Sequence, residues 1–297
     1  MREMTVKERG EKKARFLANL PALVAVAAAV ALFFAPLLFL KKVPDISDIR
    51  TYYYPGWAYF GKLLRAGGME YWCPHLYCGF PLFADSELGP FYPLNRLLWL
   101  LPPLGGLVAS LFLHYLMAAL FTYAYGRYMG LTPLSALVSS LSFSLGGAMV
   151  SHLVHPNMIW AAAYLPLFLL LLEMGLRRRS AYPFILMSLV LGLQYLAGFL
   201  MIPLMEALAV PIYLLVYTWK EIENGQRIRV LAWSAGFSLA AFLLGTALGM
   251  AQNLPSYHLV KESYRAGGLD QNLADVGSLP PLQLLGLVFP RAFGTGI

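Results

Sequence analysis

Residues 16–57 read FLANLPALVAVAAAVALFFAPLLFLKKVPDISDIRTYYYPGW, an apolar run that leads into two carboxylates and a group of aromatic residues. A run of about 20 apolar residues crosses a bilayer, and residues 16–40 carry no charged side chain. Asp45 and Asp48 therefore follow the point where the chain leaves the membrane. Charge at that depth is costly unless it has a role, and aromatic rings favour the headgroup layer. The pattern predicts a functional acid on the first loop, with Asp48 as the first candidate.

The composition is that of an integral membrane protein. Of the 297 residues, 59% are apolar and only 12% are charged, and the mean hydropathy is +0.62. A soluble domain carries about 25% charged residues. The net charge of +7 lies in short basic clusters at span ends, which indicates topology, so no nucleic-acid partner is expected. The first apolar run is too long for a cleaved signal peptide.

The apolar runs predict an all-α polytopic helix bundle. Seven spans are expected, at about 16–40, 104–126, 134–150, 158–176, 181–199, 201–219 and 230–251. The predicted organisation is a basic cytoplasmic tail (1–15) and a membrane domain (16–251) that includes a large external loop (41–103). The last part (252–297) is expected to hold an external loop and the start of a further span.

Lys and Arg predict the orientation of these spans. The N-terminal tail, Arg127, the run 177–179 and the segment 220–229 fall on one side, whereas the turns 152–157 and 199–202 carry no Lys or Arg. Cytoplasmic loops are enriched in Lys and Arg. We therefore expect a multi-pass protein of the cell membrane with a cytoplasmic N-terminus.

The first external loop begins with residues at helical spacing. Four apolar residues recur on one face, namely Tyr53, Trp57, Phe60 and Leu64. Pro55 suits the first turn of such a helix, because its missing N–H costs nothing there. This predicts an amphipathic helix that lies in the external interface. The density of Pro, Gly and aromatic residues over 72–96 indicates an ordered loop after it.

The two cysteines, Cys73 and Cys78, lie together in this loop. The outside of a bacterial cell membrane is oxidising, so they either form a disulfide or stay as two free thiols. His75 stands between them, but the spacing matches no standard zinc pattern.

Several polar residues have both a functional and a structural interpretation. His152, His155 and Asn157 sit at an external turn, where the two His either bind a metal or substrate or cap a helix. Glu206 lies inside span six, which is expensive if it faces lipid, and it either has a role or pairs with a group such as Gln194.

Arg265 lies in the late external segment, close to Gly267 and Gly268. A guanidinium binds phosphate in a bidentate manner, so Arg265 is either a phosphate ligand or a solvated loop charge. Spacing alone does not choose between the two.

A series of motifs follows in order over residues 30–295. They are Asp48 with Tyr53-Tyr54-Pro55, Trp72 with Gly79-Phe80-Pro81-Leu82, Phe91-Tyr92-Pro93-Leu94-Asn95, the segments 142–147, 152–157 and 194–198, Tyr264-Arg265-Ala266-Gly267-Gly268, and Ser278-Leu279-Pro280-Pro281-Leu282 running to Phe289-Pro290. Together they resemble the YfhO family of bacterial membrane proteins, which looks like a branch of the GT-C superfamily of polytopic glycosyltransferases. The chain departs from the family at Tyr52, where Gln is frequent, and at Phe199-Leu200, where His-Pro is frequent. Family members are longer, so the resemblance implies an N-terminal fragment.

The resemblance implies a GT-C-like fold and transfer of a sugar from a polyprenyl-phosphate carrier to an extracytoplasmic acceptor, such as a cell-wall polymer or a glycolipid. By this resemblance Asp48 acts as the catalytic base or orients the acceptor hydroxyl, with Asp85 and Glu87 as helpers. The expected substrate-binding residues are Asp85, Glu87, His152, His155, Asn157 and Arg265. Membrane lipids are further partners. No cofactor is implied, and a requirement for a divalent metal is left open.

The chemistry of the residues agrees with this reaction. An acceptor hydroxyl must lose its proton as it attacks the anomeric carbon, and a carboxylate within hydrogen-bond reach can take it. The leaving phosphate needs cationic stabilisation, which Arg265 could supply.

Two other classes of function compete with an enzyme, namely a glycolipid transporter or flippase and a non-catalytic membrane scaffold. A transporter predicts ionisable groups near mid-membrane, and Glu206 is the clear candidate. An enzyme predicts acids in the external loops, and eight of the fifteen acids lie in the two large ones. This distribution favours the enzyme.

Overall fold

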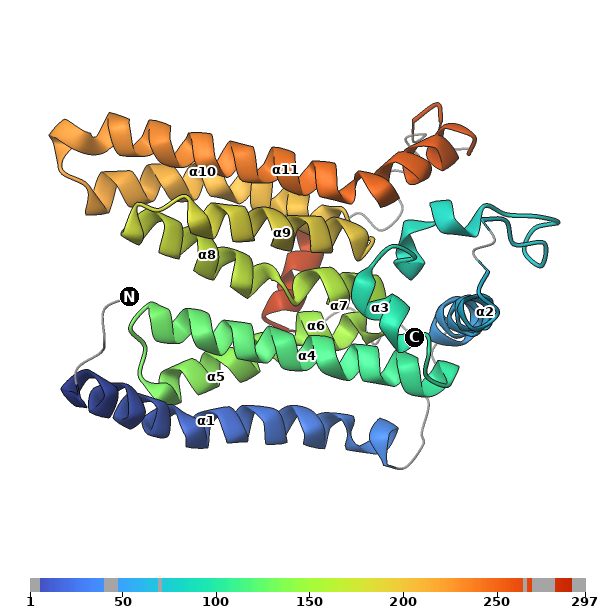
Figure 1. The fold of residues 1–297 in the computed structure, drawn as a ribbon, viewed down its shortest axis with the longest axis horizontal. Coiled ribbons are helices and arrows are strands. Elements are labelled where there is room, and N and C mark those ends of the chain that lie inside the picture. Colours follow the sequence, from blue (N-terminus) through green and yellow to red (C-terminus); the bar gives the residue numbers. More distant parts are fainter. Residues whose placement is uncertain (1–5, 40–47, 69–70, 264–265, 269–280, 290–297) are drawn as a thin grey trace. The chain divides into compact units, whose positions relative to one another are not determined.

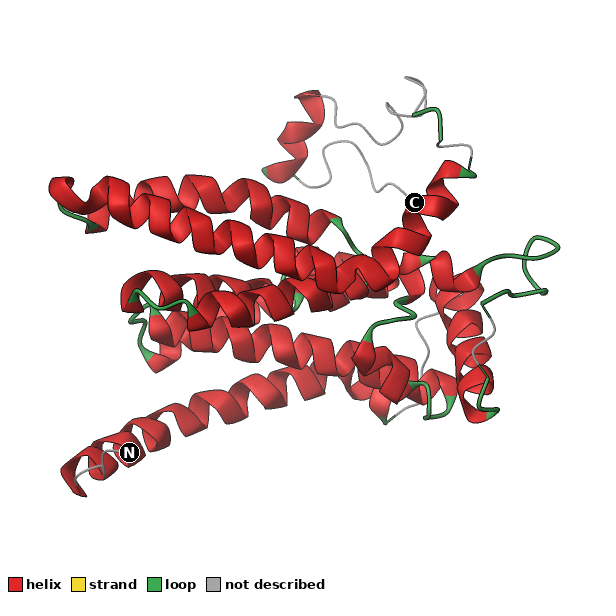
Figure 2. Cartoon of the chain, turned by 45° about the horizontal axis from the view of Figure 1, so that its top comes forward, coloured by secondary structure: helices red, strands yellow, loops and turns green. Residues whose placement is uncertain are grey.

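The computed structural model describes residues 6–39, 48–68, 71–263, 266–268 and 281–289 (Figure 1). The chain divides into two compact units, Met1–Ser256 and Tyr257–Ile297. Within the described residues the secondary structure is helical, apart from an isolated antiparallel bridge between Cys73 and Phe80 (Figure 2). The predicted all-α fold is confirmed at this level.

The first unit contains most of the helices. In chain order they are α1 (Val6–Leu38), η1 (Ile49–Tyr53), α2 (Tyr54–Arg65), η2 (Leu82–Ala84), η3 (Ser86–Leu88), α3 (Pro93–Leu98), α4 (Pro103–Tyr128), α5 (Pro133–Ser144), α6 (Gly147–Ser151), η4 (His152–Val154), α7 (Pro156–Ala162), α8 (Leu165–Arg178), α9 (Tyr182–Leu196), α10 (Met201–Glu221) and η5 (Asn224–Gln226). The helix α11 (Arg227–Lys261) begins in the first unit and ends in the second, which also holds η6 (Pro281–Leu287).

Six helical segments among the described residues are long and apolar enough to cross a membrane. They are Ala18–Leu38, Pro103–Tyr128, Pro133–Val154, Pro156–Arg178, Met201–Glu221 and Arg227–Lys261. The seventh predicted span corresponds to α9, which is apolar but has only 15 residues. A bundle of this kind is a membrane-embedded, multi-pass protein.

Two of these segments are interrupted, for local reasons. Between α5 and α6 the chain turns at Gly146, where any side chain would overlap the carbonyl oxygen of Ser142. Between α7 and α8 the helix restarts at Leu165, and Pro166 occupies the first turn, where its missing N–H is tolerated. Hydropathy alone gives these spans as continuous, because a break of two residues leaves the apolar run intact.

The basic turns after α4, α8 and α10 lie at one end of the bundle, although the first loop at the other end also carries basic residues such as Arg50 and Arg65. Nε of Arg127 donates to Oδ1 of Asn19 over 2.7 Å, so the end of α4 meets the start of the first apolar segment. Nη1 of Arg179 donates to Oε1 of Gln226 over 3.3 Å, so the α8–α9 turn meets the α10–α11 turn. These contacts bring together basic turns that the sequence predicts on one side of the membrane, and which side that is stays a prediction.

The helix α2 forms where the spacing predicts it, but its apolar face packs on protein. Tyr53, Trp57 and Phe60 are each at most 2% exposed. The ring of Phe60 stacks on Trp99 with centroids 4.5 Å apart, and Trp57 lies 6.3 Å from Trp160. Each buried aromatic side chain contributes about 1.5–3 kcal/mol. The expected apolar contact with lipid is therefore replaced by a contact with the bundle, since periodicity cannot tell the two apolar surroundings apart.

Candidate functional site

Asp48 forms an ion pair across the loop end of the bundle, opposite the basic end. Oδ2 of Asp48 lies 3.3 Å from Nε2 of His155, and the two side chains are 45% and 41% exposed. Asp48 directly precedes η1, which is anchored by the buried Ile49. His155 is the residue before α7, where Pro156 begins the helix. Both groups are thus fixed by helix starts while they stay open to solvent.

A second histidine continues this line. Nδ1 of His152 lies 3.4 Å from Nδ1 of His155. Which of the two nitrogens donates depends on the tautomers of the rings. Asp48, His155 and His152 thus form a line of polar contacts.

An apolar cavity begins at His152. Its volume is about 420 Å³, and it lies among the residues of α5 to α8 and the start of α10. Apolar side chains form most of its wall, including Phe143, Met149, Met158, Ile159, Leu165 and Ile202. The only titratable side chain in its wall is His152. A cavity of this size and lining accommodates part of a hydrocarbon chain.

Asn157 connects the first loop to α7. Its Oδ1 accepts a hydrogen bond from the Tyr53 hydroxyl over 2.9 Å and another from the backbone N–H of Met158, also over 2.9 Å. Burial, with the nearby charge of Glu87 as a smaller cause, raises the pKa of Tyr53, so its hydroxyl stays a neutral donor. Asn157 is 5% exposed, and its oxygen is occupied by two donors. The structure places it as a positioning group beside His155.

Asp85 forms the second acidic group of the site. Its Oδ2 accepts a hydrogen bond from the Tyr52 hydroxyl, and its Oδ1 accepts the backbone N–H of Glu87 over 3.1 Å. Burial raises the pKa of Asp85, although both hydrogen bonds oppose that shift. Burial and the charge of Asp85 also raise the pKa of Tyr52. The side chain of Glu87 is exposed at the surface of the same segment.

Side chains of α11 hold this acidic segment against the bundle through its backbone carbonyl groups. Nε2 of Gln252 donates to the carbonyl oxygen of Phe83 over 3.3 Å, and Oγ of Ser256 donates to that of Ala84 over 2.7 Å. Gly198, at φ +88°, packs so tightly that any Cβ would overlap the carbonyl oxygen of Ser86. The helix α11 therefore continues through Gln252, where the sequence predicts an external loop, and supports the site.

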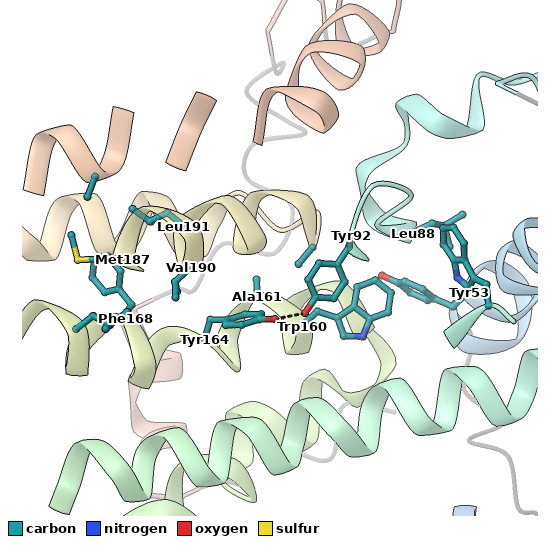
Figure 3. Close-up of a cluster of buried hydrophobic side chains, with 14 of the residues drawn as sticks. Tyr53, Leu88, Tyr92, Trp160, Ala161, Tyr164, Phe168, Met187, Val190 and Leu191 are labelled. Carbon is teal, nitrogen blue, oxygen red and sulfur yellow. Dashed lines mark hydrogen bonds between the residues drawn. The ribbon is translucent and has the colours of Figure 1, made fainter. Parts of the chain in front are cut away.

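A buried network beneath the site was missed by the sequence analysis. The Tyr92 hydroxyl lies 2.7 Å from the Tyr164 hydroxyl (Figure 3). It also lies 2.8 Å from Nε2 of His114. Nδ1 of His114 lies 2.6 Å from the carbonyl oxygen of Ser110, which fixes this nitrogen as the N–H donor. Trp160 stacks on Tyr92 with centroids 6.4 Å apart. The signal for this network in the sequence was His114, a histidine inside an apolar span.

Glu206 pairs with Gln194, as one of the two sequence interpretations has it. Nε2 of Gln194 donates to Oε1 of Glu206 over 2.8 Å and to the carbonyl oxygen of Ala161 over 3.3 Å. Glu206 lies five residues after Met201, the start of α10, or about 7.5 Å along the helix axis. Half of a typical hydrocarbon core is about 15 Å. The pair therefore lies in the first half of α10, toward its loop end.

No other polar candidate from the sequence joins this site within the part of the chain that the structure describes. Arg265 and Asp45 lie outside the described residues. Cys73 and Cys78 are both free thiols, the first buried and the second exposed. Among the described residues, no three His, Cys, Asp or Glu side chains lie close enough together to hold a metal ion.

The fold and this site define a multi-pass helical membrane protein with an acid–histidine line at its loop end. No protein-family model, curated protein or solved structure matches the chain. Its function is therefore argued from the site.

Proposed function

We propose that this protein is a membrane glycosyltransferase of GT-C type, which transfers a sugar from a polyprenyl-phosphate carrier to an extracytoplasmic polymer or glycolipid. One observation carries the proposal. A half-exposed carboxylate, Asp48, is joined through His155 and His152 to an apolar cavity of about 420 Å³. The two ends of this line suit the two parts of the reaction, a hydroxyl acceptor and a lipid-linked donor.

The carboxylate of Asp48 serves as the base. As the acceptor oxygen bonds to the anomeric carbon, the bond from that carbon to the phosphate oxygen breaks, and the hydroxyl proton passes to Asp48. The side chain is 45% exposed, so an acceptor can reach it. His155 holds the carboxylate in place through its Nε2. The products are the glycosylated acceptor and the polyprenyl phosphate.

The donor lipid suits the cavity. Polyprenyl chains are hydrocarbon, and the wall of the cavity is almost entirely apolar. His152, at its edge, is positioned to meet the phosphate that follows the chain. Arg265, from the sequence alone, is the proposed second contact to that phosphate, since a guanidinium matches phosphate oxygens.

The orientation follows from the basic end. We place the N-terminus and the basic turns in the cytoplasm and the site on the outside of the cell membrane, by the excess of Lys and Arg. The acceptor then comes from the extracytoplasmic side.

Movement of a glycolipid across the membrane is the second candidate function. Glu206 lines a cavity of about 270 Å³, and its Oε2 has no hydrogen-bond partner among the described residues. An ionisable group of this kind is expected in a transporter. Its position near the loop end, and its bond to Gln194, favour the enzyme.

Filling the donor cavity tests the proposal. A Cβ at Gly147, which lines the cavity, would have no atom within 4 Å, so Gly147→Leu places its side chain in the open space. We expect transfer to fall and the apparent KM for the polyprenyl-phosphate sugar to rise. Gly236→Leu is the matched control, because Gly236 also has open space but lies in α11, away from the cavity wall. Equal donor dependence in the two variants would exclude this cavity as the lipid site.

A further inference from the structure

We infer that the loop after α2 carries a binding pocket for a single sugar ring, next to Asp85. The pocket has a volume of about 170 Å³. Pockets for drug-sized ligands begin at about 300 Å³, so this one has room for a ligand about the size of one pyranose. The inference rests on the proposed function, because the ring belongs to one of the two substrates of that reaction.

The lining combines rings and a few polar groups with an apolar wall, which includes Pro55, Leu76, Leu82 and Leu88. Three rings, those of Tyr52, Tyr59 and His75, border the pocket together with the hydroxyl-bearing Thr51. His75 meets Tyr59 edge to face, with centroids 6.0 Å apart. The C–H faces of a pyranose pack on aromatic rings, while its hydroxyl groups bond to the surrounding nitrogen and oxygen atoms. A pocket that combines aromatic walls with a few polar groups fixes such a ligand in one orientation.

The rim of the pocket is preorganised. Cys73, which lies in the wall, pairs with Phe80 through two backbone hydrogen bonds of 2.7 and 2.9 Å. Any side chain at Gly79 would collide with the ring of Trp72, so one face of that ring rests on backbone. Trp72 is nevertheless 56% exposed. Trp72 lies outside the pocket wall, so its contact with Gly79 fixes the hairpin that carries Cys73 and His75.

The backbone of this hairpin is also strained. Tyr77 and Cys78 are consecutive non-glycine residues with φ of 50° and 63°. Such conformations cost of order 1–3 kcal/mol each and cluster at ligand sites. The strain is consistent with a loop whose shape serves binding.

The pocket is connected to the proposed reaction centre. Tyr52 lines it and also donates its hydroxyl to Asp85. The next residue, Tyr53, bonds to Asn157, two positions after His155. A sugar ring in the pocket therefore lies against the same short segment that carries Asp48.

A lipid headgroup layer is the competing occupant for exposed aromatic residues. Both views of the chain show the loop between α2 and η2 extending past the ends of the long helices of the first unit (Figures 1 and 2). That direction leads away from the hydrocarbon region. The placement therefore favours a soluble sugar group over membrane lipid.

The test measures sugar binding apart from catalysis. Methyl glycosides of common hexoses and N-acetylhexosamines are titrated into the purified Asp48→Asn protein, with binding followed by saturation-transfer NMR. We expect at least one glycoside to bind, and His75→Ala, in the pocket wall, to weaken it by about three- to tenfold, as expected for a lost ring contact. His75→Phe should restore part of the affinity. Tyr182→Ala, a change at an exposed aromatic residue at the start of α9 and outside the pocket wall, should have no effect.

The other outcomes separate the explanations. In the active protein, a His75→Ala effect on the KM for donor assigns the ring to the carrier-linked sugar, and an effect on the KM for acceptor assigns it to the acceptor. If the glycosides bind through His75 but no transfer is ever detected, the pocket stands and the proposed function fails. If no glycoside binds, the inference is wrong.

Discussion

Nε2 of His155 lies 3.3 Å from Oδ2 of Asp48, so the start of α7 and the end of the first loop meet in an ion pair open to solvent. Buried polar groups surround this pair, among them Tyr53 and Asn157. An exposed ion pair adds little to stability, about 0–1 kcal/mol. The pair is therefore not needed for the stability of the fold, and the proposed function gives it a role in the reaction.

The first prediction concerns His155 as a positioning residue. His155→Ala removes the contact to Asp48 but leaves the carboxylate itself, so kcat should fall by less than the about 10²–10⁴-fold expected for loss of the base. His155→Gln keeps a donor and should recover part of the rate. Rates are measured in membranes at saturating donor. Equal losses in His155→Ala and Asp48→Asn would show that the histidine itself carries the proton.

The second prediction is topological. In a Cys73→Ser background, the exposed native Cys78 should react with a membrane-impermeant maleimide in intact cells. A Gln226→Cys variant that also carries Cys78→Ser should react only after lysis, because Gln226 lies at the basic end. The reverse pattern would invert the orientation and place the site in the cytoplasm.

The third prediction follows from the raised pKa of Asp85. Because burial raises this pKa in the folded state, the folded protein holds the proton at pH values where the unfolded chain has lost it. Stability should therefore fall as pH rises from the ordinary value of about 3.9 through the raised pKa. In Asp85→Asn this component of the pH dependence of Tm should be absent. Glu87→Gln, at an exposed neighbour, should keep the wild-type slope.

The fourth prediction concerns Gly198, which lets the turn after α9 touch the acidic segment. Gly198→Ala introduces a Cβ at φ +88° and against the Ser86 carbonyl oxygen, so we expect a loss of about 1–3 kcal/mol and a displaced segment. Hydrogen exchange of residues 82–88 should increase. Gly236→Ala, where a Cβ has open space, is the control. Unchanged exchange in Gly198→Ala would mean that the turn does not hold the segment.

The spans could be predicted from sequence because each is a local apolar run. The same is true of α2, whose spacing and Pro55 specify a helix without reference to other residues. What could not be predicted is the surface that covers its apolar face, since Trp57 would be as well placed in lipid as against Trp160. The short breaks before Gly147 and Leu165 could not be predicted, because each consists of only two residues without charge. Two such residues leave the hydropathy of the span almost unchanged.

The site was only partly accessible to sequence reasoning. Asp48 and His155 were each singled out as polar residues at the ends of spans, but nothing local joins them. The pairing of Asp85 with Tyr52 and the network around His114 depend on tertiary packing, so no spacing rule finds them. The apolar cavity beside His152 arises from the same packing.

The central claim, that Asp48 is the base of a sugar transfer, is tested most directly by Asp48→Asn. The protein is expressed in cells that lack its gene, and incorporation of carrier-linked sugar into polymer or glycolipid is measured in their membranes. The account predicts that Asp48→Asn lowers transfer by about 10²–10⁴-fold at equal protein level. Glu221→Gln, at the last residue of α10 and far from the loop end, should leave transfer unchanged. Full transfer by Asp48→Asn would contradict the account.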